Sequence, residues 1–154
     1  MASLSAGLLM YRQRGDVLEV FLGHPGGPFW KNRDLGVWSI PKGEVQPDEE
    51  PLAAACREFA EETGIEPAGP FVPLGSVKQK GGKTVQAWAF AGEADPAAVR
   101  CNTFRMEWPP RSGKFIDVPE IDRCDWFDPE TAKAKLNPAQ AEFVDRLLAI
   151  LPGG

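Results

Sequence analysis

The spacing of apolar residues predicts a succession of strands and helices along the chain. Residues 4–11 and 17–22 are short apolar segments separated by a polar turn with a Gly-Asp pair, a pattern typical of a β-hairpin. Residues 71–77 and 84–90 are a second pair of β-capable segments, and the turn between them is rich in lysine and glycine. We therefore expect these four segments to contribute strands to a sheet, and we expect a further short strand to end at Pro41.

Residues 52–63, between the two pairs, are predicted to form a helix. They are good helix formers, and they are followed by Gly64, a residue type that commonly ends helices. At about 100° per residue, one side of this helix packs; its residues are Leu52, Cys56, Phe59, Ala60 and Thr63. Glu58, Glu61 and Glu62 fall within an arc of about 100° on nearly the opposite side.

The last part of the chain predicts further strands and two helices that serve as scaffold. Residues 103–108 and the Trp-Phe pair at 126–127 fit strands. Residues 128–136 and 137–151 each begin with Asp or Asn followed by proline, which is typical of a helix N-terminus. An apolar stripe in the last helix should pack on the sheet. We therefore predict an α/β fold with a mixed β-sheet between helices.

Composition and charge narrow the classes of protein. A chain of 154 residues predicts one domain over 1–154, and its net charge of −5 argues against general nucleic-acid binding through a basic surface. Three cysteines without metal-ligand spacing favour a reducing, cytoplasmic compartment. No apolar run approaches 18 residues and the N-terminus lacks a basic region, so we expect neither a membrane span nor a signal peptide. The sequence indicates no oligomeric state.

Three glutamates on one side of a helix allow two interpretations. Like charges at this spacing destabilise a helix by about 0.2–0.5 kcal/mol per pair, and for the triplet alone a solvated acidic face is the simpler interpretation. A hard divalent cation would reverse the repulsion, because carboxylate and carbonyl oxygens are the ligands that Mg²⁺ prefers. The surrounding residues decide between these interpretations.

Residues 43–65 fit the pattern Gly-x5-Glu-x7-Arg-Glu-U-x-Glu-Glu-x-Gly-U, where U is a bulky apolar residue. The matching positions are Gly43, Glu49, Arg57, Glu58, Phe59, Glu61, Glu62, Gly64 and Ile65. At ordinary residue frequencies the odds of a chance match are on the order of 10⁻⁹ per start position. The stretch is a complete Nudix box, and the chain resembles the Nudix hydrolases. This resemblance implies the α/β/α Nudix sandwich and a metal-dependent hydrolase of nucleoside diphosphate-linked compounds.

The resemblance also implies a catalytic site. Glu58 and Glu62, with the carbonyl of Gly43, would bind Mg²⁺, or Mn²⁺ as a substitute, and Glu61 would be a further ligand or the base that orients water. Arg57 lies off the carboxylate arc, and we expect it to hold carboxylates such as Glu49 in place. A distal carboxylate that many Nudix enzymes present to their metals corresponds to Glu120, with Glu107 in reserve.

Four further residues are candidates for substrate binding. Lys42 precedes the box and can contact phosphate or be an ordinary loop lysine. Phe29 and Trp30, in a Gly/Pro-rich loop over 23–37, can stack on a base or cover the core edge. Trp88 is predicted to lie on the face of its strand opposite Val85 and to line a cleft. His24, the only histidine, is expected to make a structural hydrogen bond at a strand end.

The substrate class stays open at this point. The segment Pro-Lys-Gly at 41–43, which leads into the box, resembles Nudix branches that act on dinucleoside polyphosphates or diphosphoinositol polyphosphates. Nudix enzymes that remove oxidised nucleoside triphosphates often have Gly-Gly at this place. Nucleoside triphosphates remain an alternative substrate. A non-catalytic nucleotide-sensing module would share the fold, but it would be expected to carry substitutions in the box, and the box here has none.

Overall fold

A mixed six-stranded sheet forms the centre of the computed structural model, which describes residues 3–151. Its strands are β1 (Leu4–Arg14), β2 (Val17–Pro25), β3 (Lys42–Glu44), β4 (Val72–Lys78), β5 (Thr84–Ala91) and β8 (Ile121–Phe127). The order is β4-β5-β1-β2-β8, and β3 pairs with β1. β1 and β5 run parallel, and the other pairs are antiparallel. Both predicted strand pairs are confirmed.

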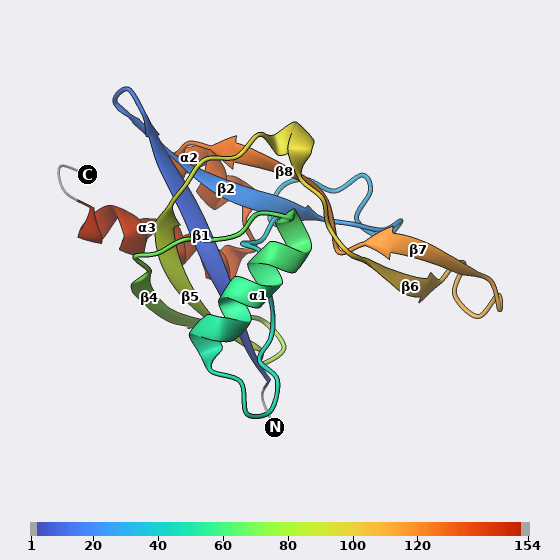
Figure 1. Ribbon diagram of the computed structural model, residues 1–154. Helices are drawn as coiled ribbons and strands as arrows, with labels where there is room; N and C mark the ends of the chain where they lie inside the picture. Colours follow the sequence, from blue (N-terminus) through green and yellow to red (C-terminus); the bar gives the residue numbers. More distant parts are fainter. Residues whose placement is uncertain (1–2, 152–154) are drawn as a thin grey trace.

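Helices cover both faces of this sheet (Figure 1). α1 (Pro51–Thr63) lies over one face, and α2 (Pro129–Lys135) and α3 (Ala141–Ile150) lie over the other; η1 (Pro96–Ala98) and η2 (Pro138–Gln140) are short 3₁₀ turns. Alternation along β1 separates the two cores, since Leu8 and Met10 pack with α1 whereas Leu9 packs with α2 and α3. The predicted α/β/α sandwich and both C-terminal scaffold helices are confirmed.

α1 begins and ends as the sequence predicts, but it is rotated about its axis. Pro51 occupies the first turn, and Gly64 ends the helix at φ 77°. The buried apolar residues are Ala54, Ala55 and Phe59, while Leu52 and Cys56 are half-buried. Glu62 is only 5% exposed. The prediction that Glu62 lies on the side of α1 away from the packing face was therefore wrong. The last turns of α1 lie against β3, and Glu62 therefore points into the protein.

Two strands form a separate ribbon that extends away from the main sheet (Figure 1). β6 (Thr103–Glu107) pairs with β7 (Phe115–Pro119) alone. The ends of this ribbon meet at its root, where the N–H of Glu120 donates to the carbonyl of Asn102 at 3.4 Å. The Glu120 carbonyl in turn accepts the N–H of Gly26 at 3.0 Å. Glu120 is thus held by its backbone where the ribbon joins the sheet.

Two details of the sequence interpretation were wrong. The strand predicted to end at Pro41 lies later, at β3, and Trp38 and Ser39 make only isolated bridges. Proline has no N–H to donate to a ladder, and the carbonyl of Pro41 accepts instead from Leu8. Trp88, predicted to line a cleft, lies instead in the core at 8% exposure, because β5 is an interior strand and α1 covers the face from which Trp88 points.

Two further observations concern the cysteines and the lengths of the helices. The three cysteines are free thiols, and burial raises the pKa of Cys124 to about 12. Within residues 3–151, no helix combines the length and the apolar character that crossing a membrane requires.

Candidate active site

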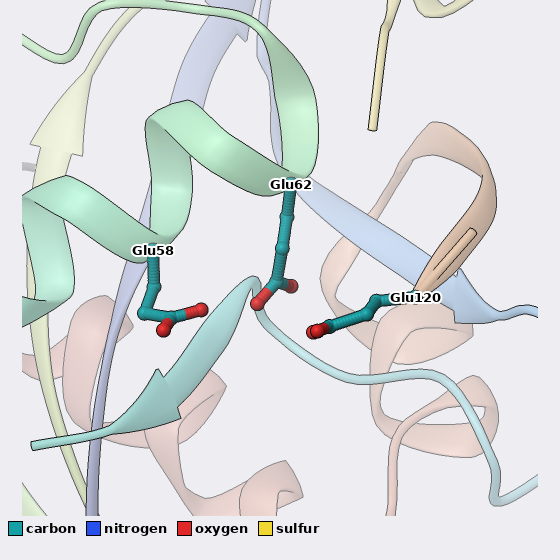
Figure 2. Close-up of side chains that lie close together, drawn as sticks. All are labelled: Glu58, Glu62 and Glu120. Carbon is teal, nitrogen blue, oxygen red and sulfur yellow. The ribbon is translucent and has the colours of Figure 1, made fainter. Parts of the chain in front are cut away.

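Three carboxylates from two parts of the chain converge at one end of α1. Glu58 and Glu62 project from successive turns of the helix, and Glu120 reaches toward them from the root of the ribbon (Figure 2). One carboxylate oxygen from each lies within 4.8 Å of the others. Among the described residues they form a cluster of ligand atoms that a metal ion could share.

Glu62 is the most deeply buried member of this cluster. Its Oε1 accepts the N–H of Lys42 at 3.3 Å, and its Oε2 is buried without a hydrogen-bond partner among the described residues. Burial, and then the adjacent Glu58 carboxylate, raise the pKa of Glu62 to about 10. Burial and the charges of Glu58 and Glu61 also raise the pKa of Glu120. Both shifts have the same cause, because ionising a carboxyl group that is buried beside other carboxylates is unfavourable.

Gly43 lies close against the carboxylate end of Glu58. A methyl group on its Cα would lie 2.0 Å from Cδ of Glu58 and 2.2 Å from Oε2. β3 therefore passes directly under the carboxylate, because Gly43 has no side chain. This close approach explains the glycine at the first position of the motif.

Arg57 connects Glu58 to the loop before the helix. Its Nε and Nη2 donate to the two oxygens of Glu49 at 2.8 and 3.0 Å, and its Nη1 donates to Glu58 and Glu61, each at 2.8 Å. The hydrogen bonds from Arg57 and from the Gln46 N–H lower the pKa of Glu49 to about 2. The predicted contact between Arg57 and Glu49 is confirmed.

Glu61 and Glu107 lie outside the cluster. The Glu61 carboxylate bonds to Arg57, and its side chain is 39% exposed. Glu107 accepts the N–H groups of Arg111 and Gly113 at 3.2 and 3.1 Å, so it stabilises the turn at the ribbon tip. Its reserve role as the distal carboxylate is therefore wrong, because the ribbon carries it away from α1.

Lys42 lines three cavities in this part of the protein. A cavity of about 430 Å³ extends from Lys42 and Glu58 toward Lys83, and a second of about 140 Å³ lies beside Glu62 and Glu120. A third, of about 220 Å³, lies on the side of Trp30. Burial, and then the charge of Lys83, lower the pKa of Lys42.

The sequence interpretation missed residues that join this site through long-range pairing. Lys83 belongs to the turn between β4 and β5 that was noted only for its lysines and glycines, yet it lines the largest of these three cavities. Ser5 lines the same cavity and has a buried hydroxyl without a hydrogen-bond partner among the described residues. The signal for both would have been the parallel pairing of β1 with β5, which places Leu4 opposite Thr84.

Gln140 is a further missed residue, and its side chain holds the segment that precedes β3. Its Oε1 accepts the N–H of Ile40 at 2.9 Å, and its Nε2 donates to Ser39 at 3.1 Å and to Gln79 at 2.8 Å. The side chain is 1% exposed. Asn137, Gln79 and Gln140 line the cavity beside Trp30.

The loop over 23–37 is anchored at its start and carries its aromatics outward. His24 is fully buried; its Nδ1 lies 2.9 Å from Asp122, and its Nε2 lies 2.6 Å from the carbonyl of Arg33. The predicted structural role of His24 is confirmed. Trp30 lines the cavity with Lys42, whereas Phe29 is 59% exposed.

The donor set fits a hard divalent cation. Three carboxylates supply oxygen ligands, and the unpartnered Oε2 of Glu62 is a buried acceptor that a cation would satisfy. Without a cation this oxygen is a buried polar atom whose desolvation is not compensated. The chemistry of the residues therefore agrees with a Mg²⁺ or Mn²⁺ site.

The comparisons with known proteins agree on one family. The model of the NUDIX domain matches residues 1–147. The chain is 29% identical over 128 residues to an RNA pyrophosphohydrolase of Rhizobium meliloti, covering 73% of this chain and 71% of that protein. A Caenorhabditis elegans Ap4A hydrolase in a binary complex has a TM-score of 0.68 at 22% identity, covering 97% of this chain and 99% of the other.

A further solved structure is similar in fold. It is the NUDIX domain of Shewanella oneidensis NrtR complexed with ADP ribose. The TM-score is 0.66 at 14% identity, and the match covers 97% of this chain and 88% of the other.

Proposed function

The chain belongs to the Nudix family, and we propose that it is a metal-dependent pyrophosphohydrolase that cleaves a phosphoanhydride bond in a nucleoside diphosphate-linked substrate. A dinucleoside polyphosphate or a nucleoside triphosphate is the proposed substrate. The observation that carries the proposal is the convergence of Glu58, Glu62 and Glu120 around a buried carboxylate oxygen without a partner. The relatives named as an RNA pyrophosphohydrolase and an Ap4A hydrolase support it.

Glu58, Glu62 and Glu120 would hold Mg²⁺, with Mn²⁺ as a substitute, together with the carbonyl of Gly43. When bound, the ion would supply charge neutralisation for phosphate oxygens and an acidified water molecule. Arg57 keeps Glu58 in position through the hydrogen bond at 2.8 Å, and Glu49 in turn holds the guanidinium.

The remaining polar residues act on the substrate and the attacking water. Lys42 and Lys83 border the cavity beside Glu58 and bind the phosphate chain. Glu61 lies outside the cluster on the same helix, and its exposed carboxylate accepts a proton from water or orients it. The balance is simple: water adds to one phosphorus, the bridging oxygen leaves with a nucleotide or phosphate, and one proton is released.

Trp30 supports a nucleoside over an inositol phosphate as the organic part of the substrate. It lines the cavity that contains Lys42, Gln79 and Asn137, and this combination of an aromatic ring with amide groups suits a nucleobase. Diphosphoinositol polyphosphates lack a ring that stacks, and they would need more cations around the cavity. They remain the second candidate because the segment Pro-Lys-Gly at 41–43 resembles the branch that acts on them. A non-catalytic sensing module is disfavoured by the complete box.

A phosphate-release screen tests this function. Purified protein with Mg²⁺ is incubated with diadenosine polyphosphates, nucleoside triphosphates, ADP-ribose and a diphosphoinositol polyphosphate, each with and without chelator. We expect hydrolysis of a nucleotide that stops in chelator, and loss of that activity in Glu62→Gln. Hydrolysis that persists in chelator would contradict metal dependence, and binding of nucleotides without any turnover would favour the sensing module.

The compartment and the partners are part of the proposal. Three free thiols suit a reducing cytoplasm, and the small-molecule nucleotide is the proposed partner. Neither a nucleic acid nor a membrane is proposed as a partner.

A further inference from the structure

The ribbon formed by β6 and β7 has two chemically different faces. Phe104 is opposite Val118 and Met106 is opposite Ile116, so these four apolar side chains share one face. Alternation places Trp108, the next residue after β6, on the same face. The other face carries the charged and polar residues of both strands and Phe115, over which Arg105 stacks at 4.4 Å. We call the first face the apolar ribbon face.

The loop that carries Trp30 lies along this apolar ribbon face from root to tip. At the root, a methyl group on Gly27 would lie 3.8 Å from Sδ of Met106 and 3.9 Å from Cγ2 of Val118. At the tip, the rings of Phe29 and Trp108 are 6.5 Å apart and meet edge to face. The loop therefore shields Val118, which is 6% exposed.

The rest of the apolar ribbon face stays in contact with solvent. Phe104 and Ile116 are 42% and 39% exposed, and Phe29 of the neighbouring loop is 59% exposed. A two-stranded ribbon has little stability of its own, and a group of large apolar side chains on a projecting element is typical of a binding surface. The tip also carries Arg111 and Lys114, both exposed, so the surface combines aromatic rings with cations.

This surface is continuous with the candidate active site. Trp30 lines the cavity that contains Lys42, its ring lies 6.1 Å from that of Phe29, and Phe29 contacts Trp108. A series of three aromatic rings thus leads outward from the phosphate-binding lysine to the ribbon tip. The root of the ribbon is Glu120 itself. A ligand anchored by its phosphates at Lys42 would meet Trp30 first and the apolar ribbon face second.

We propose that the apolar ribbon face binds a second nucleobase of the substrate, and that Trp108 and Phe104 select substrates with two bases over mononucleotides. This inference rests on the proposed function. Aromatic rings bind bases of any sequence because every base has a π-face, and nearby arginine and lysine side chains attract the phosphates between the bases. The second base can belong to a dinucleoside polyphosphate or to a 5′-triphosphorylated dinucleotide, and both have the required chemistry.

A comparison of substrates with one and two bases tests the proposal. KM and kcat are measured for ATP, for diadenosine tetraphosphate and for a triphosphorylated dinucleotide, with wild type, Trp108→Ala and Phe104→Ala. The matched control is Phe115→Ala, which removes a 50% exposed phenyl ring from the opposite face of the same ribbon. The melting temperature of each variant reports its folding. The dissociation constant for a diadenosine tetraphosphate with methylene bridges gives a readout without turnover.

We expect Trp108→Ala and Phe104→Ala to raise KM for at least one two-base substrate and the analogue's dissociation constant about tenfold, or about 1.4 kcal/mol. KM for ATP should change little, and Phe115→Ala should change neither constant. Whichever two-base substrate responds identifies the source of the second base. Equal effects on ATP, or no effect on any ligand, would overturn the proposal.

Two other outcomes separate this inference from its premise and from a protein partner. If wild type hydrolyses none of the nucleotides, the proposed function fails, and the analogue titration alone then decides whether the ribbon binds a second base. If wild type is a dimer in sedimentation and Trp108→Ala is a monomer with unchanged constants, the apolar ribbon face is an interface between copies of the chain and the proposal is wrong.

Discussion

Gly43 lies directly beneath the carboxylate of Glu58, at a separation that leaves no room for a methyl group. Gly43→Ala must therefore displace either β3 or the flexible end of the Glu58 side chain, and a displaced Glu58 loses its hydrogen bond with Arg57, so we expect a small fall in melting temperature. Because a misplacement of about 1 Å can cost about 100-fold in rate, we expect hydrolysis to fall by that order. The melting temperature and kcat of the purified variant measure the two effects.

A second substitution tests whether this overlap is the cause. Glu58→Asp shortens the side chain by one methylene group and removes part of the clash with an alanine at position 43. The double variant should melt at a higher temperature than Gly43→Ala alone. Full activity in Gly43→Ala would show that Glu58 does not act from the position described here.

Glu62→Gln should stabilise the protein in the absence of metal. The pKa of Glu62 is raised from 4.5 to about 10, so the penalty of the buried carboxylate is absent below pH 4.5. Between these values the unfolded chain ionises more readily than the folded protein, and the wild type loses stability as the pH rises. We expect the variant to melt above the wild type in chelator at about pH 8 and together with it near pH 4.

The same substitution should remove most of the activity, because the ligand loses its charge while its shape is kept. Rates within a few-fold of wild type at saturating Mg²⁺ would assign the metal to other residues. A melting temperature in chelator that is equal for both proteins at every pH would mean that folding does not shift the pKa of Glu62.

Glu49→Gln should weaken the support of Glu58 and change the acid stability. The pKa of Glu49 is lowered to about 2 by Arg57, so its stabilising effect is present above pH 4.5 and is lost as the pH falls toward 2. We expect the variant to melt below the wild type at neutral pH and the difference to vanish near pH 2. Its Mg²⁺ affinity should fall about 10-fold, as for other residues that orient ligands.

Glu50→Gln is the matched control for Glu49. Glu50 is exposed, and as the N-cap of α1 it makes no side-chain hydrogen bond to the helix. The Glu50→Gln substitution changes the net charge by the same amount as Glu49→Gln and leaves the contacts of Arg57 intact. Equal effects of both substitutions would attribute the result to charge alone.

Trp30→Ala should raise KM for the preferred nucleotide about tenfold, with a smaller change in kcat, because base–aromatic stacking contributes about 1–3 kcal/mol. Leu35→Ala, at a 69% exposed position in the same loop, is the control and should leave KM unchanged. If Trp30 only covers the core edge, the variant will lose melting temperature while the folded fraction keeps its KM.

The sequence predicted those parts of the site that lie close together along the chain. Gly43, Arg57, Glu58 and Glu62 belong to one loop and one helix, and their spacing alone defines them. Glu120 was identified only through family resemblance, because a single glutamate in a loop has no pattern. Lys83 could not be predicted to line the site, since its place depends on the pairing of β1 with β5 across a long stretch of chain.

The same limit explains the other differences. Helical periodicity gave the extent of α1, but the rotation that buries Glu62 comes from its contact with β3. Alternation placed Trp88 and Val85 on opposite faces of β5 correctly, but it could not show that α1 covers the face from which Trp88 points. The strand at 103–108 was expected, whereas its separation into a ribbon required the position of β7.

The ribbon leaves the sheet after Asn102 and returns at Glu120, and a backbone hydrogen bond of 3.4 Å joins these two residues. A segment whose ends already meet can be exchanged for one of another length at a small entropic cost. The fold thereby separates a fixed carboxylate from an interchangeable insert. Grafting different sequences between positions 102 and 120 would give a family of variants that share one hydrolytic centre and differ in the ligands they accept.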